Sequence, residues 1–347
     1  MKILIVSDAW YPQTNGVVRT LDMVRGELRR QGHAIVMITP DQFRSLPCPG
    51  YGEIRLALTG AARVGRMIDD ARPDAVHIAT EGPLGQAARR CCLRAGLPFT
   101  TAYHTNFPDY IHLRTGLPER WLAAAVRRFH APAETTMATT PTMMAKLREM
   151  GLSRLSLWSR GVDTTLFRPR NNCRAMSDLP RPIYLNVGRV AQEKNLEAFL
   201  SLDLPGSKVI VGDGPALESM KARYPDAHFT GARHGEALAA VYAMADIFVF
   251  PSRTDTFGLV MLEALASGLP VAAFPVPGPL DVIGPEGRGV KPGFDAPVGA
   301  LREDLQAAIA AARLCRPEDC RAYAELFSWR AAATQFLDNL QPLEIAA

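Results

Sequence analysis

The chain has 347 residues, 48% of them hydrophobic, and a net charge of +4. This length suits two domains of about 170 residues better than one core, and no run reaches the roughly 18 uncharged apolar residues of a membrane-spanning helix. The first apolar run ends at Asp8, too early for a signal peptide. We therefore expect a cytoplasmic globular protein.

The charge is distributed unevenly. Residues 1–170 carry +9 and residues 171–347 carry −5. A basic half favours an anionic membrane surface or an anionic acceptor, although solvated arginines on helix surfaces would give the same charge. Aromatic content is 7%, without basic-aromatic interleaving, which argues against nucleic acid. The 6 cysteines lack metal-ligand spacing and are expected to be free thiols.

The first elements alternate in type. Lys2–Ser7 has the pattern of a strand, Val17–Arg30 has helical spacing, and Ala34–Thr39 is a second strand. This order predicts a parallel sheet with helices on its faces. The turn that ends at Gly16 lacks the GxGxxG pattern, which argues against a dehydrogenase.

Two later strands of this half end in polar loops. The strands and loops are Ala75–Ala79 with Thr80–Gly85, which opens a helix over 84–95, and Pro98–Tyr103 with His104–Asp109. Open α/β sheets bind ligands at such strand ends. From the residues alone, His104 is equally a satisfied core histidine, and Glu81 equally a cap of the helix.

Residues 110–130 form a basic amphipathic stretch. Leu117, Trp121 and Phe129 fall near one face, with arginines elsewhere. Such an element can lie on a bilayer, so we expect peripheral docking on an anionic membrane; the alternative is that its apolar face packs on the sheet. Arg168–Pro182 is rich in proline, asparagine and charge, so we place a linker at 171–182, after a first domain of residues 1–170.

The second domain begins with a strand, Ile183–Val187, and a glycine-led loop. In this loop Arg189 and Lys194 can hold a diphosphate, Arg189 by its fork and Lys194 as a point charge; alternatively they are surface cations. Helices are predicted over 235–244, 297–313 and 317–340.

The stretch 246–271 predicts a strand, a loop, a buried helix and another strand. The helix, from Gly258 to Gly268, is apolar except at Glu263. A buried carboxylate must be hydrogen-bonded or paired, so Glu263 either meets a ligand such as a ribose diol or has a partner in the core. Asp255, in the preceding loop, projects into the same crevice or is a turn residue.

These segments together resemble the retaining family 4 glycosyltransferases of GT-B fold. The family has two acids separated by seven residues before an Ala-x-Ala-x-Gly-x-Pro-Val tail, matched here by Asp255, Glu263 and Ala264–Val271, and a Gly-Arg-x-x-x-Glu-Lys-Asn run, matched at 188–195. Asp255 departs from the commoner Glu, as in lipid-directed members.

The resemblance implies two Rossmann-like domains facing across a cleft, of class α/β. The acceptor domain would be residues 1–170, the nucleotide-sugar domain 183–327, and residues 328–347 a helix crossing back onto the first domain. The implied reaction moves a hexose from a UDP- or GDP-sugar to a lipid, such as diacylglycerol or a phospholipid headgroup, at the inner face of the cell membrane. UDP-glucose, UDP-glucuronate and GDP-mannose all fit.

The resemblance also implies the site. The residues implied in catalysis are His104, Arg189, Lys194 and Asp255. Those implied in donor binding are Gly16, Arg189, Lys194, Gly212, Asp213, Gly231, Ala232, Arg233, Asp255, Thr256, Phe257, Gly258, Leu259 and Glu263. Those on the acceptor side are Asn15, Glu81, His104 and Asp109. Because cations and helix N–H groups would meet the charge of the leaving diphosphate, we expect no metal, no other cofactor and no protein nucleophile.

Three alternatives stay open. The acceptor could be a soluble sugar or a phenol. A GT-B epimerase would convert a nucleotide sugar without an acceptor. A silent binding protein would turn nothing over, although the cation pair and both acids argue against this.

Overall fold

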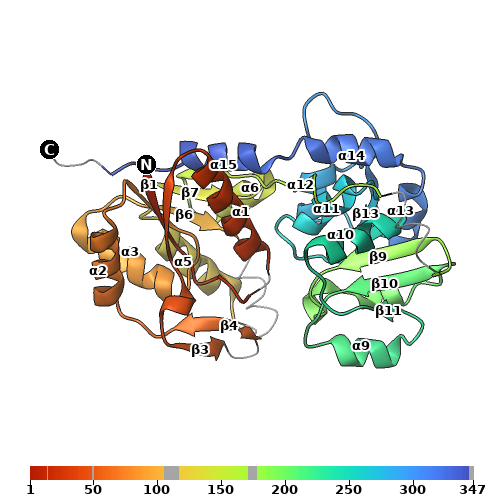
Figure 1. The fold of residues 1–347 in the computed structure, drawn as a ribbon, viewed down its shortest axis with the longest axis horizontal. Coiled ribbons are helices and arrows are strands. Elements are labelled where there is room, and N and C mark those ends of the chain that lie inside the picture. Colours follow the sequence, from red (N-terminus) through yellow and green to blue (C-terminus); the bar gives the residue numbers. More distant parts are fainter. Residues whose placement is uncertain (14, 49–50, 105–116, 171–177, 344–347) are drawn as a thin grey trace. The chain divides into compact units, whose positions relative to one another are not determined.

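The computed structural model describes residues 1–13, 15–48, 51–104, 117–170 and 178–343. The chain forms two units, and each contains a six-stranded sheet (Figure 1). The first unit comprises residues 1–160 and 329–347, and the second comprises residues 161–328.

The first unit has the strand order β2-β1-β5-β6-β7-β8, with all neighbours parallel. The strands are β1 (Lys2–Val6), β2 (Ala34–Ile38), β5 (Ala75–Ile78), β6 (Thr100–Tyr103), β7 (Thr135–Ala138) and β8 (Leu155–Leu157). The helices are α1 (Gly16–Arg30), η1 (Pro40–Gln42), α2 (Ala61–Ala71), α3 (Pro83–Ala95), α5 (Glu119–His130), α6 (Pro141–Glu149) and α15 (Trp329–Asp338). An antiparallel hairpin, β3 (Ser45–Cys48) and β4 (Tyr51–Ala57), was not predicted.

Helices cover both faces of this sheet, because side chains alternate along each strand. Leu4 and Val6 share a core with Val64 of α2 and Leu84 of α3. On the other face, the ring of His77 lies 4.9 Å from that of Phe336 in α15. The last helix of the chain therefore belongs to the first unit.

The second unit has the order β11-β10-β9-β12-β13-β14, again parallel throughout. The strands are β9 (Ile183–Val187), β10 (Ser207–Val211), β11 (His228–Phe229), β12 (Ile247–Phe250), β13 (Val271–Ala273) and β14 (Gly299–Leu301). The helices are η2 (Gln192–Lys194), α8 (Glu197–Leu200), α9 (Leu217–Arg223), α10 (Gly235–Met244), α11 (Leu259–Ala266), α12 (Pro277–Ile283), α13 (Leu305–Ala312) and α14 (Pro317–Glu325). Alternate residues again enter two cores: Phe248 packs with α10, α11 and α14, and Val249 with α8 and α13.

The boundary between the units differs from the predicted one at 170. Residues 161–169 belong to the second unit because Phe167 is buried in its core and stacks edge-on against Tyr242, with ring centroids 5.4 Å apart. Val162 N also donates to Phe327 O, at 3.0 Å. The boundary was placed too late because the change in composition begins only near the end of residues 161–169.

Two helix predictions near the C-terminus are wrong. Residues 299–301 are β14 rather than helix, because this buried apolar run pairs with β13. The predicted helix over 317–340 is two helices, α14 and α15, interrupted at 326–328 where the chain passes between the units.

Candidate functional site

The loops after β9 and β10 of the second unit are packed backbone against backbone. Gly188 N donates to Val211 O, and Val190 N donates to Asp213 O, both at 2.9 Å. A Cβ at Gly212 would lie 1.8 Å from Gly188 O, so only glycine fits there. These loops lie at the C-terminal ends of adjacent parallel strands, where open α/β sheets place ligands.

The loops after β9 and β12 are joined by an ion pair. Lys194 Nζ lies 2.5 Å from Asp255 Oδ1, and Asn195 Nδ2 donates to Pro251 O at 3.1 Å. The other carboxylate oxygen of Asp255, Oδ2, is buried without a hydrogen-bond partner among the described residues. Because a buried acceptor is costly when unsatisfied, this oxygen marks a place for a ligand donor. Arg189 lies in the same loop as Lys194 and is partly exposed.

Helix α11 begins beside this pair. Its N-cap is Gly258, at φ 82°, which brings no side chain to the first N–H groups of the helix. A Cβ there would lie 2.8 Å from Met261 Cε. Phe257 is buried, whereas Thr256 and Leu259 are partly exposed. The helix therefore offers backbone donors and its positive dipole end at this edge of the sheet.

Glu263 lies one turn further along α11 and is only 2% exposed. Tyr242 of α10 donates its hydroxyl to Glu263 Oε2 at 2.9 Å. The carboxylate thus has a partner in the core, which was one of the two interpretations of the sequence. Tyr242 was not predicted, because it lies 21 positions earlier in an apolar helix and carries no local motif.

Backbone groups of residues 231–233 make hydrogen bonds to other parts of the second unit. Ala232 N donates to Asp213 Oδ2 at 2.9 Å, and Gly212 N donates to Gly231 O at 3.0 Å. Asp213, Gly231 and Ala232 therefore lie close together. The Ala232 N–H therefore has a partner within the chain, whereas Arg233 is exposed.

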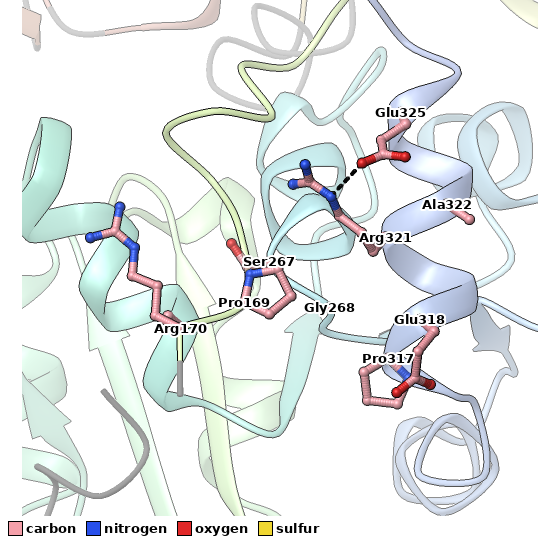
Figure 2. A pocket seen from close by; sticks show the side chains of 10 residues that line it. Pro169, Arg170, Ser267, Gly268, Pro317, Glu318, Arg321, Ala322 and Glu325 are labelled. Atoms are coloured by element: carbon pink, nitrogen blue, oxygen red, sulfur yellow. Dashed lines mark hydrogen bonds and ion pairs between the residues drawn. The ribbon is translucent and has the colours of Figure 1, made fainter. Parts of the chain in front are cut away.

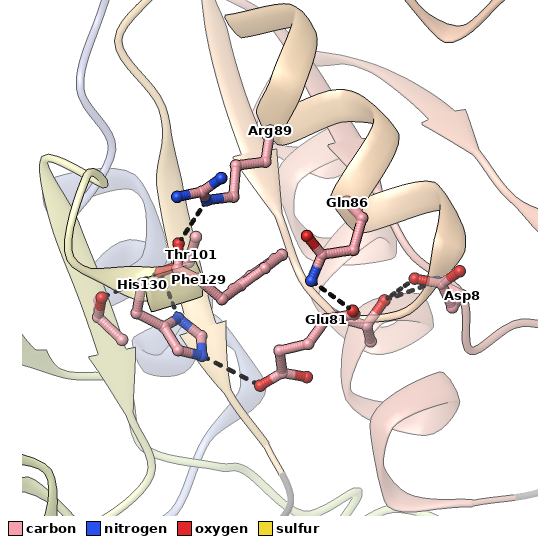
Figure 3. A network of polar contacts seen from close by, with 9 residues as sticks. Asp8, Glu81, Gln86, Arg89, Thr101, Phe129 and His130 are labelled. Carbon is pink, nitrogen blue, oxygen red and sulfur yellow. Dashed lines mark hydrogen bonds and ion pairs between the residues drawn. The ribbon is translucent and has the colours of Figure 1, made fainter. Parts of the chain in front are cut away.

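In the first unit, Asp8 closes the head of α3 (Figure 3). Its carboxylate accepts from Leu84 N at 2.8 Å, Gly85 N at 3.2 Å and Thr80 Oγ1 at 2.9 Å. Burial raises the pKa of Asp8, and the hydrogen bonds from Leu84 and Gly85 oppose that rise. The role of Asp8 in closing this helix was not predicted, although its position just after β1 is a signal. The head of this helix is satisfied within the chain.

The acceptor-side residues are distributed around this edge. Asn15 caps α1 by accepting from Val17 N and Val18 N, both at 3.0 Å, and Gly16 is the first residue of that helix. Glu81 Oε1 lies 3.1 Å from His130 Nε2, so it is held by α5 rather than capping α3 (Figure 3). Asp109 lies outside the described residues.

His104 follows β6 and packs edge-on against Trp158, with ring centroids 5.4 Å apart. Its Nδ1 lies 3.0 Å from Arg160 Nη2. Burial, together with the Arg160 charge, holds the pKa of His104 well below its ordinary value of 6.5. The residue keeps part of its surface exposed, although its Nε2 is buried. His104 therefore has the packing of a core histidine, next to the C-terminal end of a parallel strand.

Helix α5 covers the described part of the predicted amphipathic stretch. Val126 and Phe129 are buried, as expected for a face packed on the sheet. Trp121 is 59% exposed, and the three arginines of the helix, Arg120, Arg127 and Arg128, are exposed with it. Residues 110–116 lie outside the described residues. Among the described helices, none is long and apolar enough to cross a membrane.

A cavity of about 520 Å³ lies elsewhere in the second unit (Figure 2). It is lined by Ser267 and Gly268 after α11 and by α14, where Arg321 contacts Glu325 at 2.7 Å. This is the opposite end of α11 from Gly258. Arg321 also donates to Phe167 O and Ala266 O, at 2.8 and 2.9 Å, so it is engaged in holding the unit together. Within the described ranges, no His, Cys, Asp and Glu side chains gather as a metal site.

Comparison with known proteins shows the family of the chain. Residues 14–166 match the family model Glycosyltransferase Family 4, and residues 181–314 match Glycosyl transferases group 1. The chain is 34% identical over 335 residues to a GDP-mannose-dependent alpha-mannosyltransferase of Mycobacterium tuberculosis, covering 89% of this chain and 87% of that protein. It is 31% identical over 349 residues to sulfoquinovosyl transferase SQD2 of Arabidopsis thaliana, covering 89% and 67%.

A further relative is the alpha-monoglucosyldiacylglycerol synthase of Streptococcus pneumoniae, 25% identical over 312 residues, which cover 79% of this chain and 71% of that protein. Among solved structures, sucrose-phosphate synthase from Thermosynechococcus elongatus matches with a TM-score of 0.76 at 22% identity, covering 97% of both chains. WaaG, a glycosyltransferase involved in lipopolysaccharide biosynthesis, matches with a TM-score of 0.69 at 17% identity, covering 97% of this chain and 98% of WaaG. These likenesses confirm the predicted fold of two Rossmann-like domains.

Proposed function

Because the chain is a family 4 glycosyltransferase of GT-B fold, we propose that it moves a hexose from a nucleotide sugar to a lipid acceptor with retention of configuration. The observation that carries the donor half is the Lys194–Asp255 pair at the head of α11. The acceptor half is supported by the lipid-directed relative that makes monoglucosyldiacylglycerol and by the exposed surface of α5.

The donor would lie across the loops after β9 and β12. Arg189, Lys194 and the first N–H groups of α11 meet the negative charge that grows on the leaving diphosphate. Asp255 Oδ2 accepts from sugar hydroxyls, and Glu263 accepts from the ribose diol alongside Tyr242. Because fixed cations and dipoles supply this stabilisation, we propose that transfer proceeds without a metal and without a protein nucleophile.

GDP-mannose is the first donor to test, because the mycobacterial relative is named for it. UDP-sugars are the second choice. Thermal unfolding with GDP, UDP and ADP, each in EDTA, identifies the nucleotide. A ligand at 100 times its dissociation constant adds about 2.7 kcal/mol to the free energy of unfolding.

The matched variants are Glu263→Gln, which keeps the shape of the side chain, and Glu218→Gln, a carboxylate 84% exposed on α9. We expect Glu263→Gln to lose most of the nucleotide stabilisation and Glu218→Gln to keep it. No stabilisation of the wild type by any of the three nucleotides would contradict the donor assignment.

For the acceptor, we propose that α5 rests on the cytoplasmic face of the cell membrane. An exposed tryptophan with exposed arginines suits the interface of an anionic bilayer, where each cation near the surface contributes about 1 kcal/mol. Vesicles of phosphatidylcholine with and without phosphatidylglycerol separate this charge effect from apolar insertion.

The test variant combines Trp121→Ala, Arg127→Gln and Arg128→Gln. Its control combines Arg302→Gln and Arg313→Gln in the second unit. We expect the α5 variant to lose co-sedimentation with the anionic vesicles, whereas the control keeps it. Equal sedimentation of the α5 variant and the wild type would contradict the membrane assignment.

A further inference from the structure

Arg160 is a buried arginine that ends the first unit. It is 4% exposed, and its guanidinium lies over the ring of Trp158, 4.6 Å from the centroid. One nitrogen, Nη1, donates to Trp158 O at 2.8 Å and to Ser159 O at 3.2 Å. The other, Nη2, lies 3.0 Å from His104 Nδ1. Burial lowers the pKa of Arg160 to about 9, which leaves it a cation at neutral pH.

Trp158 is itself anchored, so the position of Arg160 is fixed. The indole Nε1 donates to Ala332 O of α15 at 3.1 Å. The neighbouring Ser159 N donates to Gln335 Oε1 of the same helix at 2.9 Å. The C-terminal helix therefore supports the segment that carries Arg160.

In the hydrogen bond between Arg160 and His104, only Arg160 can be the donor. A guanidinium donates hydrogen bonds and cannot accept them. His104 Nδ1 must therefore be the acceptor and carry no proton. In a neutral imidazole the proton then lies on Nε2, because the hydrogen bond made by one ring nitrogen decides the state of the other.

We propose that Arg160 is a positioning residue that fixes His104 as the neutral Nε2–H tautomer, so that the second ring nitrogen of His104 is a hydrogen-bond donor and not an acceptor. This inference rests on the proposed function and on the role that the resemblance implies for His104, in catalysis and on the acceptor side. It excludes His104 as a general base, because Nδ1 is engaged and Nε2 already carries the proton. A neutral donor can orient a sugar oxygen without supplying a proton to the leaving group.

Within the described part of the chain, the titratable groups that act on His104 come from three elements. They are Arg160 after β8, His77 on β5 and His130 on α5. His77 Nδ1 contacts Thr100 Oγ1 at 2.9 Å, and His130 is occupied by Thr101 and Glu81. Arg160 is the group that touches His104, so its removal tests the inference most directly.

The variants are Arg160→Met, which removes the donor, and Arg160→Lys, which restores one donor and the charge. The control is Arg154→Met, an arginine half-exposed beside Glu134. The first measurement is the ¹⁵N spectrum of the histidine side chains, in which His104→Gln identifies the signals of His104. The second is kcat/KM for transfer across pH 5.5–8.5.

We expect wild-type His104 to show a protonated Nε2 and an unprotonated Nδ1 across this pH range. Arg160→Met should lower kcat/KM by about 10- to 100-fold, the loss seen when the hydrogen-bond partner that orients a metal-bound histidine is removed. In its ¹⁵N spectrum, part of His104 should shift to the Nδ1–H tautomer, because the guanidinium no longer donates to Nδ1. Arg160→Lys should recover part of both, and Arg154→Met should change neither.

An Nδ1–H tautomer in the wild type would overturn the inference, as would an Arg160→Met enzyme whose kcat/KM is unchanged or whose His104 stays wholly in the Nε2–H form. If Arg160→Met does not fold, the wild-type spectrum and Arg160→Lys decide. If the wild type shows no transfer at all, the proposed function fails, and the spectrum still decides the tautomer.

Discussion

In both units, loops follow the C-terminal ends of the parallel strands. The units differ in how the N–H groups at the starts of the following helices are paired. In the first unit, the heads of both helices near the predicted site are closed by the chain: Asp8 accepts from α3, and Asn15 accepts from α1. In the second unit, α11 begins after a glycine, beside the Lys194–Asp255 pair. A helix N-terminus that a side chain has capped has fewer donors left for an anion.

This difference predicts that substitutions in the two units change different quantities. Substitutions at the heads of α1 and α3 in the first unit should change mainly the free energy of unfolding, because Asp8 and Asn15 already accept from the N–H groups there. Changes at the second edge should act mainly on the reaction, because no side chain caps α11 and Asp255 Oδ2 has no hydrogen-bond partner among the described residues. The following experiments test this division.

The largest effect is expected from Lys194→Met. Removing one preplaced group that meets charge in a transition state lowers kcat by about 100- to 1000-fold. The pair is partly exposed, at 24% for Lys194 and 17% for Asp255, so the free energy of unfolding should change by at most about 1 kcal/mol. Steady-state kinetics and urea unfolding measure the two quantities on the same preparation.

The control for this prediction is Lys221→Met. Lys221 also pairs with a carboxylate, Glu218, at 3.0 Å, but on the exposed surface of α9. We expect its kcat to equal that of the wild type. A stability loss in Lys194→Met that accounts for its whole loss of activity would show that the second edge is structural like the first.

The intermediate effect is expected from Asp8→Ala. Hydrogen bonds to a buried charged group contribute about 1.5–3 kcal/mol, and this change leaves the first N–H groups of α3 without their acceptor. Urea unfolding should show that loss, whereas kcat at a temperature where the protein is folded should be nearly unchanged.

Two further variants serve as controls for Asp8→Ala. Asp70→Ala removes an exposed carboxylate of α2 and should leave stability unchanged. Gly82→Ala keeps Asp8 but places a Cβ 2.4 Å from its Cγ, so it should destabilise the protein in the same way. A large fall in kcat for folded Asp8→Ala would show that Asp8 acts in transfer.

The division between the two edges was only partly predictable from the sequence. The strand, loop and helix of 246–271 follow from local patterns, whereas the contact between Asp255 and Lys194, 61 positions apart, does not. The partners of the buried groups do not. Arg160 lies 56 positions from His104, and Tyr242 lies 21 positions from Glu263, so only tertiary packing brings each pair together. Residues 299–301 also escaped the pattern, because their pairing with β13 decides their structure.

The smallest effect concerns the pH dependence of the first unit. Burial lowers the pKa of His77 from 6.5 to about 3, so in this range the unfolded chain binds a proton that the folded chain does not. Stability is therefore complete above pH 6.5 and falls as the pH drops, by about 1 kcal/mol between pH 6.5 and 5.5. His104 changes stability in the same direction. The test variant is His77→Asn, which keeps a hydrogen-bond partner for Thr100 Oγ1. In urea unfolding at several pH values, it should flatten the fall of stability with pH. The control is His228→Asn, at an exposed histidine, and it should leave that fall unchanged. An unchanged slope in His77→Asn would mean that another group sets the acid sensitivity, and Asp8 cannot be that group. Its raised pKa makes stability fall as the pH rises, which is the opposite sign.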